Sequence, residues 1–273
     1  MSNVPLLPLA ARTVTGLESH EVKLTVLGKS PSWQDVDGAC SGYLVEHAGF
    51  RLLLDCGNGV FAKLRRFAAY ADVDAVVISH LHADHFLDLV PFSYALTCGP
   101  RSQRARGPAL HAPPGARDCF RRVVGAWGGE RLIEDAFELR EYDPGERLQA
   151  GPLGVRFQPV PHFVATNAVE IRPAEGPRLT FGADCAPSDE LCAFARDTGL
   201  LLIEATLPEP ERDGPRGHMT PAEAGAQGRR AGARRLVITH LTDELDADHA
   251  RAEAAREFGG PVEVAHEGAV YEL

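Results

Sequence analysis

Three histidines and an aspartate crowd into six positions, as His80, His82, Asp84 and His85 of the stretch ISHLHADHFLD. The stretch follows VDAVVIS, a β-branched apolar run that predicts a buried strand, and it precedes an apolar spacing typical of a helix. In an extended turn His80 and His82 point the same way, whereas Asp84 and His85 begin the helix and point elsewhere. A solvated histidine patch is the alternative, but a strand–turn–helix setting favours a metal site in which one loop serves two ions.

Three more metal-binding side chains stand where strands are expected to end. His162 follows VRFQPVP, Asp184 ends RLTFGAD and His240 ends RRLVITH. Singly, each could be a hydrogen-bonded polar residue at a strand end. Ligands bind α/β sheets at strand ends, however, so we expect these residues to join the histidine cluster.

The order of the expected elements is that of an α/β protein. Residues 74–84 and 235–244 also echo one another, since each is an apolar strand that ends in Ser or Thr followed by His and Leu. We therefore expect one domain over residues 1–273, built from two repeated halves that face one site. Strands are predicted at 22–28, 42–47, 50–57, 75–79, 110–113, 153–162, 168–173, 178–184, 200–206, 234–241 and 267–273, and helices at 58–70, 86–96, 113–129, 220–231 and 246–260.

Composition excludes several kinds of protein. The 273 residues carry a formal charge of −10, from 28 basic and 38 acidic side chains, which disfavours extended nucleic-acid binding. The first twenty residues do not resemble a secretory signal, no run is long enough to span a bilayer, and the six cysteines are scattered. We expect a cytoplasmic protein with reduced thiols. The arginine-rich loop from Pro100 to Pro108 is interpreted as a solvated loop, with a small basic patch as the alternative.

The spacing HxHxDH, followed by His162, Asp184 and His240, resembles the metallo-β-lactamase superfamily over essentially the whole chain. The resemblance implies an αββα sandwich, with two mixed sheets flanked by helices and two divalent metal ions at one edge. It assigns Asp55, in LLLDCGNG, to orienting an imidazole through its second nitrogen. It gives His80, His82 and His162 to the first metal, Asp84, His85 and His240 to the second, and Asp184 to both.

Within the superfamily the chain resembles the phosphodiesterase branch, which includes tRNA 3′ processing endonucleases and bacterial cyclic-nucleotide phosphodiesterases. The segments LLIEATLPEP and GHMTPAEAG carry this likeness, which makes Glu204 and His218 a proton-donating pair. The alternative is that Glu204 caps a turn and His218 merely precedes the helix cap Thr220. Class B lactamases have a cysteine where this chain has Asp184, so a lactamase is not expected.

The resemblance implies a dinuclear-metal phosphodiesterase that attacks a small anionic phosphodiester, such as 3′,5′-cyclic AMP, with a metal-bridged hydroxide. Asp84 would also steer the nucleophile, and Arg216 and Asn167 are either phosphate contacts or ordinary loop residues. Zinc is the expected metal and manganese the alternative, since His and Asp ligands accept both. Dimerisation is common in this branch, so a homodimer is an expectation.

Three alternatives to this function stay open. A tRNA 3′ processing endonuclease commonly carries a long arm between the residues that match His162 and Asp184, and this chain has only two short strands there. A thioester or lactone hydrolase would need the metals but would have less use for Glu204 and His218. A non-catalytic metal-binding module would be expected to have lost some of these residues.

Overall fold

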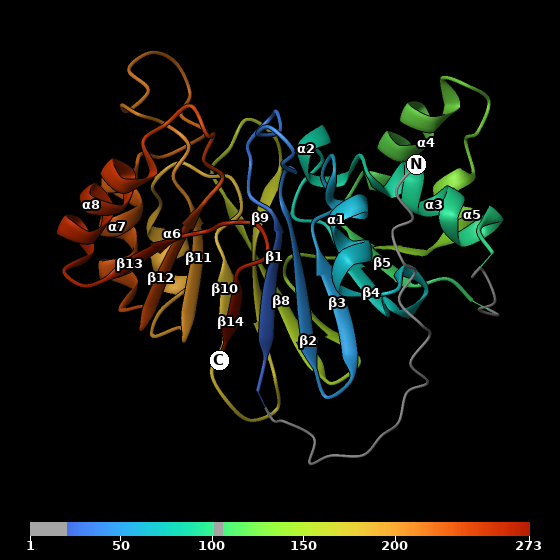
Figure 1. Cartoon of the computed structure of the whole chain (residues 1–273), viewed down its shortest axis with the longest axis horizontal. Helices are drawn as coiled ribbons and strands as arrows, with labels where there is room; N and C mark the ends of the chain where they lie inside the picture. Colours follow the sequence, from blue (N-terminus) through green and yellow to red (C-terminus); the bar gives the residue numbers. More distant parts are fainter. Residues whose placement is uncertain (1–20, 101–105) are drawn as a thin grey trace, which may run out of the picture.

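The chain folds into four layers, helices, sheet, sheet and helices, in a computed structural model that describes residues 21–100 and 106–273 (Figure 1). The predicted αββα sandwich is confirmed. Two regions interpreted from the sequence lie outside the described residues. They are the first twenty residues, which were compared with a secretory signal, and positions 101–105 of the arginine-rich loop. The assignment of one domain with two repeated halves stays a prediction.

The first sheet has seven strands in the order β14-β1-β2-β3-β4-β5-β6. Strands β14, β1, β2 and β3 pair antiparallel, and β3, β4, β5 and β6 pair parallel. The strands are β1 Lys23–Gly28, β2 Gly42–His47, β3 Phe50–Leu54, β4 Ala75–Val77, β5 Ala109–Ala112, β6 Glu138–Glu141 and β14 Val270–Glu272.

The second sheet repeats this plan in the order β13-β12-β11-β10-β9-β8-β7. Here β7 to β10 pair antiparallel, and β10 to β13 pair parallel. The strands are β7 Arg147–Ala150, β8 Leu153–Val160, β9 Thr166–Arg172, β10 Leu179–Phe181, β11 Leu200–Glu204, β12 Arg235–Thr239 and β13 Val262–Val264.

Helices cover the outer face of each sheet, and an apolar layer fills the space between the sheets. Helices α1 to α5 pack on the first sheet, and α6 to α8 on the second (Figure 1). In the central layer, alternate residues such as Leu52 and Leu54 of β3 share one core with Phe157 of β8 and Val169 of β9. The helices are α1 Val60–Phe67, α2 Ala83–Phe86, α3 Leu89–Cys98, α4 Ala116–Gly125, α5 Leu132–Ala136, α6 Asp189–Phe194, α7 Pro221–Ala231 and α8 Ala247–Phe258, with a 3₁₀ turn η1 at Tyr70–Asp72. No helix in the described part of the chain has the length and apolarity to cross a bilayer.

The predicted helix over residues 86–96 is wrong in its bounds, because the chain forms two helices there. Helix α2 ends at Phe86, and α3 begins at Leu89 after a break at Asp88. The Asp88 carboxylate accepts a hydrogen bond from the Phe61 backbone N–H (2.8 Å), which ties the break to the start of α1. Pro91 then falls in the first turn of α3, where its missing N–H costs nothing.

The parallel strands deliver polar side chains to one edge of the sandwich. Asp55 follows β3, His80 lies beyond β4, Asp184 beyond β10, and His240 directly after β12, while Glu204 ends β11. Asp55 and His240 adopt left-handed backbone angles, with φ of 57° at both residues. Such angles are unusual outside glycine and turn the chain sharply, so the residue after the last paired position faces the site instead of continuing the strand.

Candidate metal centre and active site

Seven side chains predicted from separate parts of the chain converge at this edge. Their potential ligand atoms fall into two groups, in each of which all atoms lie within 4.8 Å of one another. The first group is His80, His82, His162 and Asp184, and the second is Asp84, His85, Asp184 and His240. Asp184 belongs to both groups, so the arrangement matches the sequence-based division into two sites that share one carboxylate.

In the first group three imidazoles surround one point. Nε2 of His162 lies 3.0 Å from Nδ1 of His82, and the His80 ring centroid is 4.9 Å from that of His82 and 5.1 Å from that of His162. The Asp184 Oδ2 atom lies 3.8 Å from His80 Nε2 and 3.9 Å from His162 Nε2. Three nitrogens and one carboxylate oxygen form a donor set that suits a tetrahedral zinc ion.

In the second group two imidazoles and two carboxylates face each other. Asp84 Oδ2 lies 3.4 Å from Nε2 of His85 and 3.4 Å from Nε2 of His240. The same two nitrogens lie 3.3 Å from Oδ2 of Asp184. Asp184 Oδ2 is therefore within 4 Å of four histidine nitrogens, which is the position of a bridging ligand.

Two buried atoms provide a test of whether a metal ion fits here. The Nε2 atoms of His80 and His85 are buried and have no hydrogen-bond partner among the described residues. A buried polar atom without a partner costs about 1–3 kcal/mol, so such atoms are rare unless something else satisfies them. Both atoms point into the clusters, where a cation would accept their lone pairs. The residues present therefore fit divalent cations.

The second ring nitrogen of four histidines is held by the protein. Nδ1 of His85 donates to Asp55 Oδ2 (2.7 Å), Nδ1 of His80 lies 3.1 Å from Ser79 Oγ, Nδ1 of His162 donates to the Gly217 carbonyl (2.7 Å), and Nδ1 of His240 lies 2.8 Å from Thr206 Oγ1. These contacts place the proton on Nδ1 and leave Nε2 free for a cation. Asp55 thus makes the hydrogen bond on which its predicted orienting role depends.

Sequence reasoning missed two of these supports, Ser79 and Thr206. Ser79 donates its backbone N–H and its hydroxyl to Asp55 (2.7 and 2.8 Å) and contacts His80 through the same hydroxyl. Thr206 donates to Glu204 (2.7 Å) and contacts His240. The one indication of these roles in the sequence is where the two hydroxyl residues stand: each lies within two residues of a functional side chain at a strand end.

Burial keeps the first group of histidines neutral. Burial, followed by the charge of His85, holds the pKa of His80 well below its usual value. Burial also lowers the pKa of His82, and it lowers that of His162 to about 4. Neutral imidazole is the form that binds metal, so these three ligands need to lose no proton at neutral pH.

Glu204 and His218 form a hydrogen-bonded pair beside the clusters. Nδ1 of His218 donates to Glu204 Oε1 (2.9 Å), and the His218 ring lies 4.9 Å from the His162 ring and 5.7 Å from the His240 ring. Burial would lower the pKa of His218, but the hydrogen bond and charge of Glu204 raise it to about 8. The alternative in which His218 only precedes a helix cap is therefore incomplete: Thr220 does cap α7, and His218 also pairs with Glu204.

The two further candidates, Arg216 and Asn167, are engaged elsewhere. The Arg216 guanidinium pairs with both carboxylate oxygens of Glu223, at 2.9 and 2.8 Å. Asn167 lies in β9 and not in a loop, it is buried, and its amide donates to the Tyr142 hydroxyl (3.3 Å). Both side chains therefore already have partners in this arrangement, and the loop interpretation of Asn167 is wrong.

The fold and this site define a metallo-hydrolase, a class in which cations held at the edge of an αββα sandwich activate water. Residues 50–241 match the β-lactamase superfamily domain, and the chain belongs to this family. That match includes strands of both sheets and all seven clustered residues.

Individual relatives are similar over nearly the whole chain. The chain is 31% identical to the probable metallo-hydrolase YhfI of Bacillus subtilis, over 92% of this chain and 100% of the relative. The crystal structure of YhfI has a TM-score of 0.83 at 29% identity and covers 93% of this chain and 100% of that one. The chain is also 30% identical to ribonuclease Z of Myxococcus xanthus, over 92% of this chain and 98% of the relative. The structure of a diphosphatase from the PhnP family shares the fold, with a TM-score of 0.72, 18% identity, and coverage of 93% and 97%.

Proposed function

We propose that this protein is a two-metal phosphodiesterase acting on a small phosphodiester, with a cyclic nucleotide such as 3′,5′-cyclic AMP as its substrate. His80, His82 and His162 would hold one cation, Asp84, His85 and His240 the other, and Asp184 both. When bound, two divalent cations lower the pKa of a coordinated water and neutralise charge on the phosphoryl oxygens. Zinc suits the nitrogen-rich first group, and manganese is the alternative for the second.

The Glu204–His218 pair is the observation that carries this proposal. Hydrolysis of an alkyl phosphodiester expels an alkoxide, which needs a proton as it leaves. Glu204 takes the Nδ1 proton of His218 in a hydrogen bond (2.9 Å), so the proton on Nε2 is the one available to a leaving group. The buried Glu204 carboxylate is itself fixed by the backbone N–H groups of Cys185 and Met219. A lactone or thioester hydrolase has less need of such a donor.

Asp84 has a second role in the proposal. Its carboxylate lies between the His85 and His240 nitrogens, and these neighbours hold its pKa well below the usual value against the opposing effect of burial. It therefore stays ionised at any working pH. An ionised carboxylate at this point orients the proton of an attacking water and fixes its lone pair toward phosphorus.

The negative charge of the chain and its shorter length than ribonuclease Z favour a small substrate over tRNA. The chain has a formal charge of −10, whereas binding a nucleic-acid backbone needs several cationic contacts. The alignment with the Myxococcus ribonuclease Z extends over 305 positions, more than the 273 residues of this chain, so that relative has segments that this chain lacks. Residues 162–184 hold only β9, β10 and a short turn.

Phe163 supports a substrate with an aromatic base. Its side chain is 52% exposed, yet its ring lies 5.1 Å from the His162 ring and 5.8 Å from the His218 ring. Gly217 packs so closely below it that a Cβ there would come within 2.3 Å of the ring. An aromatic ring held in place at the mouth of a phosphodiester site is a platform on which a nucleobase can stack.

A turnover panel tests the proposal. The protein is reconstituted with zinc or with manganese and given cyclic nucleotides, a tRNA precursor, bis-p-nitrophenyl phosphate and a lactone. We expect the cyclic nucleotides and bis-p-nitrophenyl phosphate to be hydrolysed, with the highest kcat/KM on cyclic AMP. Cleavage of the tRNA precursor at a higher kcat/KM, or of the lactone alone, would replace this function with one of the alternatives.

A further inference from the structure

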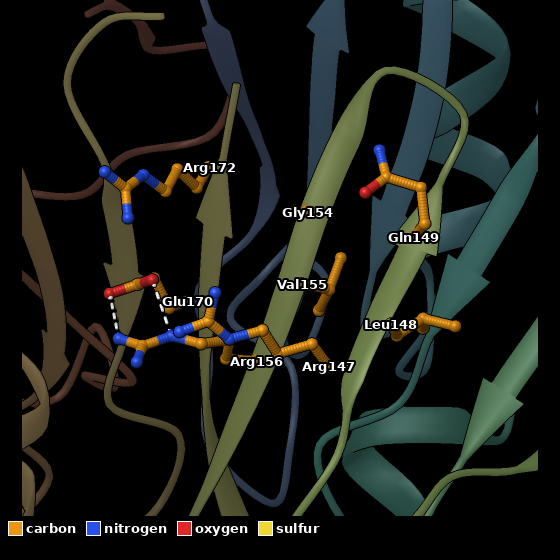
Figure 2. A pocket seen from close by; sticks show the side chains of 8 residues that line it. All are labelled: Arg147, Leu148, Gln149, Gly154, Val155, Arg156, Glu170 and Arg172. Carbon is orange, nitrogen blue, oxygen red and sulfur yellow. Dashed lines mark hydrogen bonds and ion pairs between the residues drawn. The ribbon is translucent and has the colours of Figure 1, made fainter. Parts of the chain in front are cut away.

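A second group of charged residues lies on the outer face of the second sheet, far from the metal centre. Strands β7, β8 and β9 form a shallow pocket there of about 180 Å³ (Figure 2). Gly154 and His162 are eight positions apart along β8 and its extension, which places the pocket roughly 25 Å from the clustered histidines. Eight residues line it: Arg147, Leu148, Gln149, Gly154, Val155, Arg156, Glu170 and Arg172.

The strand register creates the hollow. Gly154 on β8 pairs with Gln149 on β7 and with Arg172 on β9, so a residue without a side chain stands between two long ones. A Cβ at Gly154 would come no closer than 3.7 Å to the Arg172 carbonyl and 3.9 Å to the Gln149 amide oxygen. Position 154 therefore has room for a larger side chain, and glycine leaves that room to the pocket.

Positive charge around the hollow exceeds negative charge. Three arginines line it, and its one carboxylate, Glu170, is buried and already holds two guanidinium groups, those of Arg156 and Arg178. Arg147 and Arg172 have no ion-pair or hydrogen-bond partner for their guanidinium groups within the described ranges 21–100 and 106–273. Such an excess is unexpected in a chain whose formal charge is −10.

One of these arginines is fixed in place. Arg156 donates from Nε and Nη2 to the two oxygens of Glu170, at 2.9 and 2.8 Å, and its guanidinium lies 5.2 Å from the centroid of the Phe194 ring (Figure 2). Its remaining N–H groups are free to donate elsewhere. Arg147 stands directly opposite Arg156 in the strand register. Like charges opposite one another destabilise a sheet, so an anion between them would relieve repulsion.

We propose that this pocket binds a small phosphate-bearing anion of the size of pyrophosphate or of the terminal phosphates of a nucleotide. Guanidinium groups bind phosphate oxygens bidentately, and Arg147, Arg156 and Arg172 approach the hollow from three neighbouring strands. The Gln149 amide nitrogen donates to the Gly151 carbonyl (2.8 Å) and its oxygen faces position 154, so the donors to the anion are the three arginines. The inference does not depend on the function proposed for the metal centre.

Titration calorimetry with pyrophosphate and with ATP, at constant ionic strength, tests the inference and separates an inorganic ligand from a nucleotide. We expect binding and a rise in Tm for at least one of them. Arg147→Ala and Arg172→Ala should each weaken binding about tenfold, the size of one charge-assisted contact. Gly154→Leu should weaken it similarly by filling the hollow while removing no charge. Arg251→Ala is the matched control, since Arg251 pairs with Asp248 on α8 and should leave binding unchanged.

Pyrophosphate also binds divalent cations, so the metal centre must be separated from the pocket. Binding at the pocket should keep its affinity in His82→Ala and be weakened about tenfold in Gly154→Leu. The reverse pattern would place the anion at the metal centre and overturn the inference, as would the absence of binding by both ligands. Tm values of the variants without ligand verify that each one is folded.

Discussion

Replacement of His218 by alanine separates proton donation from every other role of the site. The structure limits the damage, because the imidazole is 16% exposed and loses one hydrogen bond, while Glu204 retains donors from Cys185, Thr206 and Met219. The loss of one hydrogen bond to a carboxylate costs about 1.5–3 kcal/mol of stability, so the variant should fold and keep its metals.

The expected loss of activity depends on the leaving group. A positioned general acid contributes about 10²–10⁴-fold, or about 3–5 kcal/mol of barrier, when the leaving group is a basic alkoxide. We expect His218→Ala to lower kcat on 3′,5′-cyclic AMP by this factor. A p-nitrophenolate leaves without a proton, so the loss on bis-p-nitrophenyl phosphate should stay within about tenfold.

The pH dependence of the rate is a second test of proton donation by His218. A general acid acts while protonated, so the rate on the alkoxide substrate should fall as pH rises through the pKa of His218. Glu204 raises that pKa to about 8, whereas the positive charge of bound cations acts in the opposite direction. We therefore expect the alkaline limb at or below pH 8 in the parent enzyme, and no such limb in His218→Ala.

The assay measures steady-state kinetics on both substrates, with metal content determined on the same samples. His249→Ala is the matched control, because that imidazole is 72% exposed on α8 and belongs to none of the clusters of described residues that could hold a metal ion. Equal losses on the two substrates with metal content unchanged would refute proton donation by His218. Loss of metal in the variant would instead assign His218 to holding the cluster together.

Three other predictions concern the ligands, their support and the substrate. His82→Ala should lose metal and activity together while its circular dichroism is unchanged; turnover at full metal content would contradict the ligand assignment. Asp55→Asn removes the charge and one of the two acceptor oxygens that Ser79 and the His85 Nδ1 proton share, and it should weaken metal affinity about 10–100-fold, measured by competition with a chelator. Phe163→Ala should raise KM for cyclic AMP about tenfold and leave kinetics on a base-free ribose cyclic phosphate unchanged; equal effects on both would remove its role in base recognition.

The metal centre was the most predictable part of this molecule, and the reason lies in the parallel strands. Apolar runs such as VDAVVIS mark where a buried strand ends, and parallel strands bring their carboxyl ends to one edge. His80 and His240 could therefore be expected at one site although they are far apart in the chain. Support from Ser79 and Thr206 could not, because it depends on side-chain directions after tight turns.

The edge strands β6 and β7 were missed for a different reason. Strands β6 and β7 read ELRE and RLQA, and the side chains of β6 are at least partly exposed throughout. An edge strand with few buried residues has no clear alternation, and charged residues there prevent pairing with other chains. The arginine pocket could not be predicted either, because only the pairing register of the strands places Gly154 between Gln149 and Arg172.

Charge connects the metal centre to the choice of substrate. Asp55, Asp84, Asp184 and Glu204 are each at most 7% exposed, so four carboxylates share one poorly solvated edge of a chain with a formal charge of −10. Without positive charge such a site repels a phosphodiester and is costly to bury. Two divalent cations, as proposed, would balance the four carboxylates, and a protonated His218 would then leave the site positive. Under the proposed function, the cations would therefore control whether an anionic substrate enters as well as how it reacts.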